Sequence, residues 1–184
     1  LRSAKRIIIT GCGSAYYAGL VGELMIEELA GIPVETEIAS EFRYRRFTAP
    51  TEGTILLAVS QSGETADTLE AIREAKKHGL LTLGIVNAVG SSIARETDAG
   101  VYNHAGPEIG VASTKAFVSQ LTVFAMLALH LRRLRGIEAD QSLTTELIRE
   151  LTRLPDHAKK ILAKKDELAH IAATHGDMRD ALFI

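Results

Sequence analysis

The chain has 184 residues, of which 46% are hydrophobic and 24% charged, so it is long enough for one compact domain with a hydrophobic core and some additional structure. Its formal net charge of −2 argues against a dedicated nucleic-acid-binding protein, which would normally carry a basic surface. The single cysteine excludes an internal disulfide and fits a reducing compartment.

No segment has the pattern of a signal peptide or of a membrane span. The chain passes from six mostly polar residues directly into an apolar strand. The longest apolar run, residues 121–131, is well short of the ~20 residues that a span needs. We therefore expect a cytoplasmic protein whose partners include neither membrane nor nucleic acid. The absence of an initial methionine suggests a fragment of a larger protein.

Apolar runs of strand length alternate with helical patterns in the first 135 residues. Strands are predicted at residues 6–10, 34–39, 54–59, 81–86 and 100–104, and helices at residues 16–30, 66–78, 91–96 and 113–133. This alternation predicts a three-layer α/β/α sandwich with a five-stranded parallel sheet of the flavodoxin-like type. Helix 113–133 is apolar nearly all round, so it is either central or in contact with a partner chain.

The composition changes after Gly136, where charged, amphipathic segments begin. Helices are predicted at residues 141–154 and 156–175, with Pro155 between them starting the second. The last four residues, 181–184, have the pattern of a buried strand. We therefore divide the chain into a domain at residues 1–135 and a helical segment at residues 136–184, which leads into the first strand of an absent second domain.

The loop after the third strand carries the clearest chemical signal. Residues Ser60–Thr65 (Ser-Gln-Ser-Gly-Glu-Thr) place three hydroxyls, a glycine and free backbone amides at the start of helix 66–78. A helix N-terminus carries about half a positive charge and holds phosphate well. Ser62 or Thr65 could instead only cap the helix, although a cap needs one such residue and not three. The pattern favours a reversible phosphate site that uses no Lys or Arg.

Two further loops follow strands whose carboxyl ends meet at the same edge of the predicted sheet. The segment Gly11–Tyr16 begins like a dinucleotide-binding fingerprint, but Tyr16 replaces its third glycine, which disfavours a nicotinamide site. Residues 106–115 combine glycines with Glu108, Ser113 and Lys115. Ser113 is either a helix N-cap or a site residue, and Glu108 and Lys115 either transfer protons or form an ion pair.

We predict no metal site and no cofactor. The six histidines are scattered along the chain, and none stands at a trusted ligand spacing from another His, Cys or carboxylate. Cys12 lacks an evident base partner, so a small residue filling a tight turn is the favoured interpretation over a nucleophile.

The segment Ser60–Thr65 resembles the signature of the sugar isomerase (SIS) domain family. Three further stretches are similar to one branch of that family, the glucosamine-6-phosphate synthases: Cys12–Ser14, Ala39–Tyr44 and Glu108–Lys115. The resemblance implies the SIS fold and a position as the first of two SIS subdomains in an isomerase region.

The resemblance also implies roles for individual residues. Substrate-binding roles fall on Ser14, Ser60, Gln61, Ser62, Thr65 and the backbone around Val111. Residues that could also belong to the site are Gly13, Gly63, Glu108, Ser113 and Lys115. Relatives usually carry Thr-Ser where this chain has Ser14-Ala15, so a contact from position 15 is in doubt.

The parent enzymes make glucosamine 6-phosphate from fructose 6-phosphate and glutamine in amino-sugar biosynthesis. Their proton-transfer glutamate, ring-opening histidine and imine-forming lysine would lie beyond Ile184, and their glutaminase domain is also outside this chain. The resemblance therefore implies a fragment that binds sugar phosphate without turning it over, with a second SIS subdomain, a glutaminase domain and a second copy as partners. A non-catalytic sugar-phosphate-sensing SIS module, or another SIS enzyme such as an isomerase or deaminase, is the alternative.

Overall fold

The computed structural model describes residues 1–47, 51–110, 113–137 and 141–180. The chain forms two compact units, Leu1–Ala139 and Asp140–Ile184, and each is described by itself. The first unit contains the whole sheet and the loops in which the candidate site residues lie.

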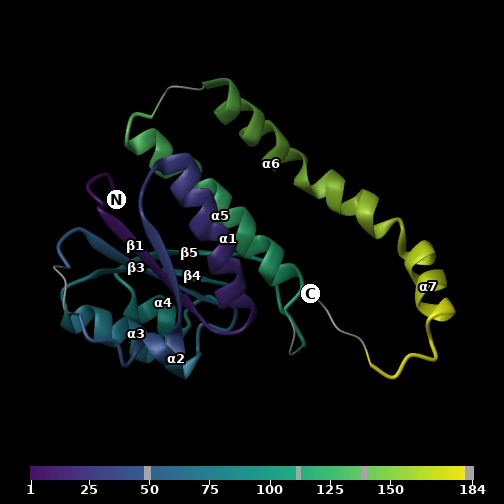
Figure 1. The fold of residues 1–184 in the computed structure, drawn as a ribbon, viewed down its shortest axis with the longest axis horizontal. Helices are drawn as coiled ribbons and strands as arrows, with labels where there is room; N and C mark the ends of the chain where they lie inside the picture. Colours follow the sequence, from purple (N-terminus) through teal and green to yellow (C-terminus); the bar gives the residue numbers. More distant parts are fainter. Residues whose placement is uncertain (48–50, 111–112, 138–140, 181–184) are drawn as a thin grey trace. The chain divides into compact units, whose positions relative to one another are not determined.

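The sheet of the first unit has five parallel strands in the order β2-β1-β3-β4-β5. The strands are β1 (Arg6–Gly11), β2 (Val34–Ile38), β3 (Thr54–Ser60), β4 (Leu81–Val86) and β5 (Ala99–Tyr102). β3 is central and buried at every position, because helices cover both of its faces. The three-layer α/β/α sandwich with a flavodoxin-like strand order is thereby confirmed (Figure 1).

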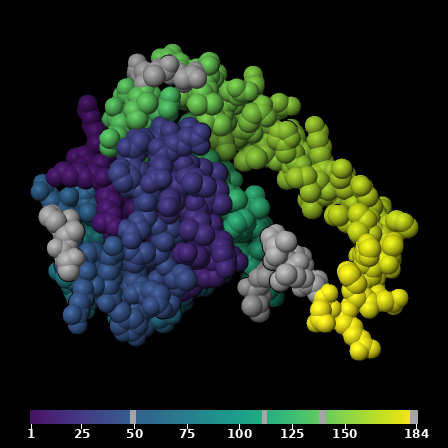
Figure 2. Space-filling model, in the orientation of Figure 1, coloured from purple at the N-terminus to yellow at the C-terminus, as the bar shows by residue number. Residues whose placement is uncertain are grey.

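Two helical layers enclose this sheet (Figure 1). On one face lie α1 (Ser14–Ala30) and α5 (Lys115–Leu134), and on the other lie α2 (Ala39–Phe42), α3 (Ala66–Lys77) and α4 (Ser92–Glu96). Each layer has its own apolar cluster, since alternate side chains of a strand point to opposite faces. In the space-filling view the purple and blue atoms of α1, β2 and α2 form one continuous surface on the viewed side of the first unit (Figure 2).

Helices α1 and α5 approach closely where Gly22 meets Phe124. A Cβ atom added at Gly22 would lie 2.4 Å from the Phe124 ring, so only glycine fits there without movement. Phe124 itself is fully buried. Because α5 is packed in this way, its apolar character reflects central burial on one side, and Val118 and Met126 remain exposed on the other.

The boundaries of several elements differ from the sequence predictions. α1 begins at Ser14 and not at Tyr16, directly after Gly13 with φ 56°. β5 ends at Tyr102 and not at His104, because His104 has a left-handed φ of 53° that no strand continues through. The short helix α2, with Ala39 and Phe42 both buried, was not predicted.

The second unit consists of α6 (Gln141–Leu162) and α7 (Lys165–Thr174). The prediction that Pro155 starts a new helix was wrong, because Pro155 lies inside α6. A proline removes one backbone hydrogen bond, and the exposed helix continues past it to a turn at Ala163–Lys164. The strand predicted at residues 181–184 lies outside the described residues.

Candidate functional site

The candidate site lies at the topological switch point of the sheet, between β1 and β3. The connection after β1 leads outward to β2, and the next strand, β3, pairs with β1 on the other side. The carboxyl ends of β1 and β3 are therefore adjacent at the switch point, where open α/β sheets bind their ligands. A Cβ atom on Gly11 would lie 3.0 Å from the carbonyl oxygen of Val59, which shows how closely the two strand ends approach.

The loop Ser60–Thr65 is held by hydrogen bonds of its own hydroxyls. The Oγ of Ser60 accepts a hydrogen bond from the Gly63 amide (3.0 Å) and shares a second one with Thr65 Oγ1 (3.1 Å). Ser60 is only 3% exposed, whereas Ser62 is exposed and its Oγ accepts from the Glu64 amide (3.2 Å). The Ser60–Thr65 pair uses one hydroxyl proton between its members, so one proton remains for a ligand.

The amino end of α3 carries no side-chain cap. Thr65 occupies the N-cap position with φ −64° and ψ 115°, and its hydroxyl makes no capping hydrogen bond. The first amides of a helix have no partner within the helix, so the amino end of α3 can donate to an anion. The alternative in which Ser62 or Thr65 only caps α3 therefore finds no hydrogen bond to support it.

The amino end of α1 repeats this arrangement at the neighbouring strand. Gly13 is its N-cap, and no side chain makes a capping hydrogen bond there. Ser14 is half-buried, and Ala15 is 8% exposed with its Cβ directed towards Gly11. Position 15 holds an alanine, so Ser14 is the aliphatic hydroxyl side chain that the first turn of α1 offers.

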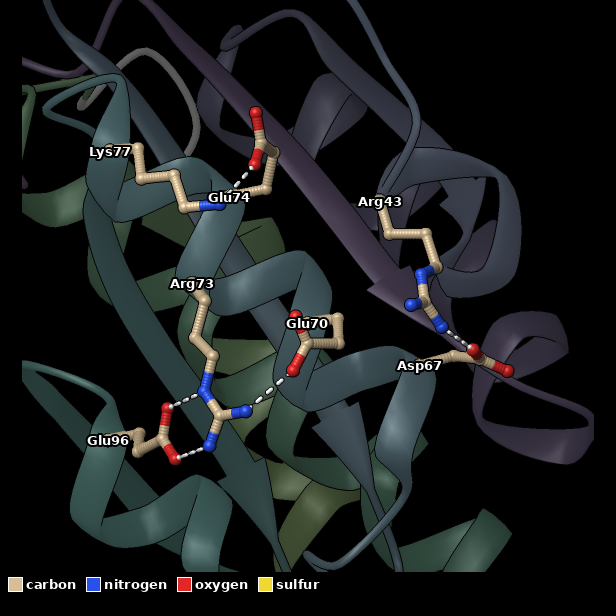
Figure 3. A network of polar contacts seen from close by, with 7 residues as sticks. All are labelled: Arg43, Asp67, Glu70, Arg73, Glu74, Lys77 and Glu96. Carbon is tan, nitrogen blue, oxygen red and sulfur yellow. Dashed lines mark hydrogen bonds and ion pairs between the residues drawn. The ribbon is translucent and has the colours of Figure 1, made fainter.

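The charges around the loop are compensated by neighbours. Asp67, in the first turn of α3, accepts a hydrogen bond of 2.8 Å from Arg43 Nη1, and this pair raises the pKa of Arg43 (Figure 3). Arg43 belongs to the stretch Ala39–Tyr44 that the sequence singled out, but its position beside α3 depends on helix α2, which was not predicted. The sequence pattern therefore gave no sign that this cation lies near the loop.

Arg73 fastens α3 to α4, and further ion pairs lie within α3 itself. Arg73 donates to both oxygens of Glu96, at 2.9 and 2.5 Å, and to Glu70 at 2.5 Å, while Lys77 pairs with Glu74 at 3.0 Å (Figure 3). The hydrogen bonds from Arg73 lower the pKa of Glu96. These exposed pairs orient the helices and contribute little stability individually.

Glu108 is engaged at the amino end of α5. Its carboxylate accepts from the amides of Thr114 (2.9 Å) and Ala116 (3.3 Å) and from the hydroxyls of Ser113 and Thr114 (both 2.9 Å). Led by the Thr114 amide, these bonds lower the pKa of Glu108 to about 2. A carboxylate with so low a pKa is a poor proton acceptor near neutral pH. Within the described residues, its contacts go to the helix end and not to Lys115.

Ser113 also serves α5, since its Oγ accepts from the Phe117 amide at 3.1 Å. Lys115, the first residue of α5, is exposed. The predicted contact of the Val111 backbone lies outside the described residues. Among the residues that the structure covers, no group of three or more His, Cys, Asp or Glu side chains could hold a metal ion. In the same part of the chain, no helix is both long and apolar enough to cross a membrane.

A pocket of about 520 Å³ opens at the opposite edge of the sheet, away from these loops. It is lined by Arg2, Ser3, Ala4, Lys5, Pro33 and Arg135. Its cations lie where α1 and α5 end, and Arg135 Nη1 donates to the Ala4 carbonyl at 3.2 Å. Positive charge at the carboxyl end of helices balances their dipoles, which accounts for this composition without a ligand.

Comparison with known proteins finds one matching family model and several similar enzymes. Residues 1–130 match the model of the SIS domain family. The chain is 49% identical over 184 residues to a glutamine–fructose-6-phosphate aminotransferase (isomerizing) of Chlorobaculum tepidum, and 46% identical over 183 residues to one of Thermus thermophilus. It covers 30% of each of these relatives.

A solved structure gives the same result at the level of the fold. The C-terminal domain of glucosamine-fructose-6-phosphate aminotransferase from Francisella tularensis superposes with a TM-score of 0.88 and 37% identity, over 95% of this chain and 49% of that one. A second solved structure, from Clostridium difficile, shares the fold, with a TM-score of 0.75 and 24% identity over 90% of this chain and 49% of that one.

Proposed function

This chain belongs to the SIS domain family, and from that premise we propose that its first unit binds the phosphate of a sugar phosphate. The observation that carries the proposal is the uncapped amino end of α3 beneath the hydroxyl-rich loop Ser60–Thr65, next to the equally uncapped α1. Two helix amino ends and several hydroxyls converge at one switch point, and this combination binds phosphate monoesters.

Within this site, we assign the phosphate contacts to the hydroxyls of Ser62 and Thr65 and to the backbone amides of the loop, with Gln61 beside them. Ser60, at 3% exposure, accepts from the Gly63 amide and in this assignment donates to Thr65, which leaves the Thr65 hydroxyl proton for the ligand. Ser14 and the backbone around Val111 contact the sugar in this assignment. Gly13 and Gly63 allow the close approach of the backbone, at φ 56° and 67°.

The identity of the relatives supports a more specific role. We assign the chain to the first SIS subdomain of a glutamine–fructose-6-phosphate aminotransferase, because the relatives named so are 46–49% identical over its whole length. The parent enzyme would convert fructose 6-phosphate and glutamine to glucosamine 6-phosphate. The chain spans about 30% of those relatives, so a glutaminase domain and a second SIS subdomain belong to the same proposal.

In this proposal the described loops bind the sugar phosphate, and other residues transfer protons. The described loops offer hydroxyls, amides and helix dipoles, which bind and orient an anion. Glu108, with a pKa of about 2, is unsuited to remove a carbon-bound proton. Proton transfer would therefore come from residues outside this chain, and residues 136–184 would lead into the subdomain that supplies them. The parent would be a cytoplasmic homodimer.

Thermal unfolding of the 184-residue chain tests the phosphate assignment. Fructose 6-phosphate or glucosamine 6-phosphate should raise the midpoint temperature, because a ligand that binds only the folded state stabilises it. Fructose at the same concentration should leave the midpoint unchanged. An equal shift with fructose would refute a site built around the phosphate group.

A further inference from the structure

Glu64 stands inside the loop to which we assign the phosphate, although a negative charge at that place should repel an anion. Glu64 is exposed and is the charged residue of the segment Ser60–Thr65. A carboxylate directly before the helix start that binds an anion weakens the affinity for that anion, unless the carboxylate points away from it. The contacts of its carboxylate show where that charge goes.

The Glu64 carboxylate points towards helix α4, which lies in the connection between β4 and β5. Its Oε1 accepts a hydrogen bond of 2.8 Å from the backbone amide of Ser92, the first residue of α4. The hydroxyl and then the amide of Ser92 lower the pKa of Glu64, and nearby Arg95 adds to this effect. Arg95 also donates to Ser92 Oγ at 3.0 Å, so the three residues form one polar cluster.

The same connection holds the loop at two other points. The Ile93 amide donates to the Gly63 carbonyl at 2.9 Å, and the amides of Asn87 and Ala88 both donate to the Gln61 carbonyl at 3.3 Å. These bonds hold the Gln61 and Gly63 carbonyls against the connection that follows β4. Glu64 adds the only one of these links that is made by a side chain of the loop within the described residues.

Gly63 shows how closely the loop rests on this connection. It has φ 67°, and a Cβ atom at this position would lie 2.0 Å from Ser91 Oγ. The Ser91 side chain is 5% exposed, and its Oγ is buried without a hydrogen-bond partner among the described residues. The contact between Gly63 and Ser91 therefore prevents the loop from moving closer to α4. The hydrogen bond from Ser92 to Glu64 prevents it from moving away.

We propose that Glu64 is a positioning residue of the phosphate loop: its carboxylate ties the loop to the Ser92 amide, fixes the loop's position at the amino end of α3 and holds its negative charge away from the phosphate. This inference rests on the proposed function. It assigns Glu64 no contact with the ligand. The loss of its hydrogen bond changes ligand affinity through the loop.

Two substitutions in the 184-residue chain separate this role from simple charge repulsion. Glu64→Gln removes the charge and keeps an oxygen that accepts from Ser92, whereas Glu64→Ala removes both. Titration calorimetry with fructose 6-phosphate should show about tenfold weaker binding for Glu64→Ala, which corresponds to one hydrogen bond lost. Glu64→Gln should bind within about threefold of the wild type. Glu28→Gln, an exposed residue near the far end of α1, is the control for a change of net charge.

Three other outcomes would contradict the role of Glu64 or the proposed phosphate site. Tighter binding by both Glu64 variants would show that the carboxylate repels the ligand and would overturn the inference. An earlier denaturant midpoint for Glu64→Ala with unchanged affinity would reduce the hydrogen bond to a stabilising contact and would also overturn it. If the wild-type chain itself fails to bind fructose 6-phosphate, the proposed function is refuted, and the inference falls with it.

Discussion

Replacement of Ser62 by alanine is the most direct test of the phosphate loop. Ser62 is exposed, and among the described residues its hydroxyl accepts one hydrogen bond, from the Glu64 amide at 3.2 Å, which water can satisfy after the change. Stability should therefore move by no more than about 0.5 kcal/mol. If the hydroxyl donates to a phosphate, its loss costs roughly 1.5–3 kcal/mol of binding free energy, or about 10- to 150-fold in Kd.

Ser60→Ala provides the contrast, because Ser60 is 3% exposed and its Oγ receives the Gly63 amide. A buried donor left without a partner costs about 1–3 kcal/mol, so this variant should lose both stability and affinity. Denaturant unfolding gives the first quantity, and calorimetric titration with fructose 6-phosphate gives the second. Affinity that stays within error for Ser62→Ala would refute the reasoning, since no other described contact of that hydroxyl explains its place in the loop.

Three further outcomes follow from the geometry. The 184-residue chain should show no conversion of glucose 6-phosphate to fructose 6-phosphate above background; robust turnover in a coupled assay would place the base among its own residues. Because the pKa of Glu108 falls from an ordinary 4.5 to about 2 on folding, its contribution to stability is present above pH 4.5 and is lost as the pH falls towards 2. Glu108→Gln should therefore have a flatter dependence of the denaturant midpoint on pH over that interval, and an unchanged dependence would contradict the cap. Gly63→Ala should destabilise more than Gly31→Ala, since both glycines have positive φ (67° and 60°) but only Gly63 meets a neighbour, Ser91; equal denaturant midpoints would show that the loop yields freely.

The sheet could be predicted from sequence because its signal is local. Each buried strand is a short apolar run, and glycines such as Gly31 and Gly79 end the preceding helices with φ 60° and 72°. The places where prediction failed depend on more distant contacts. Helix α2 has four residues, too few for a helical period, and it forms because Ala39 and Phe42 are both buried. Proline is favoured at the first position of a helix, but Pro155 lies inside α6, which is long enough to bear the loss of one hydrogen bond.

The candidate site was predictable as a set of loops and not as a set of contacts. Hydroxyls and a glycine beside a helix start suffice to predict a candidate anion site, since the helix amino end itself provides most of the attraction for the anion. The sequence left the role of Glu108 open between proton transfer and an ion pair with Lys115. Only the fold brings its carboxylate to the amides of Thr114 and Ala116. Likewise, the pairing of Arg43 with Asp67 joins residues 24 positions apart through two separate helices.

The lack of Lys and Arg in the loop Ser60–Thr65 has a consequence for the rate and salt dependence of binding. Arg43 is paired with Asp67, and Glu64 lies in one polar cluster with Arg95, so these charges give the loop no net positive charge that would attract an anion over long distances. Hydroxyls and helix amino ends act within a few ångströms, well inside the Debye length of about 8 Å at physiological ionic strength. A sugar phosphate should therefore arrive by unsteered diffusion, and its affinity should change little between low and physiological salt.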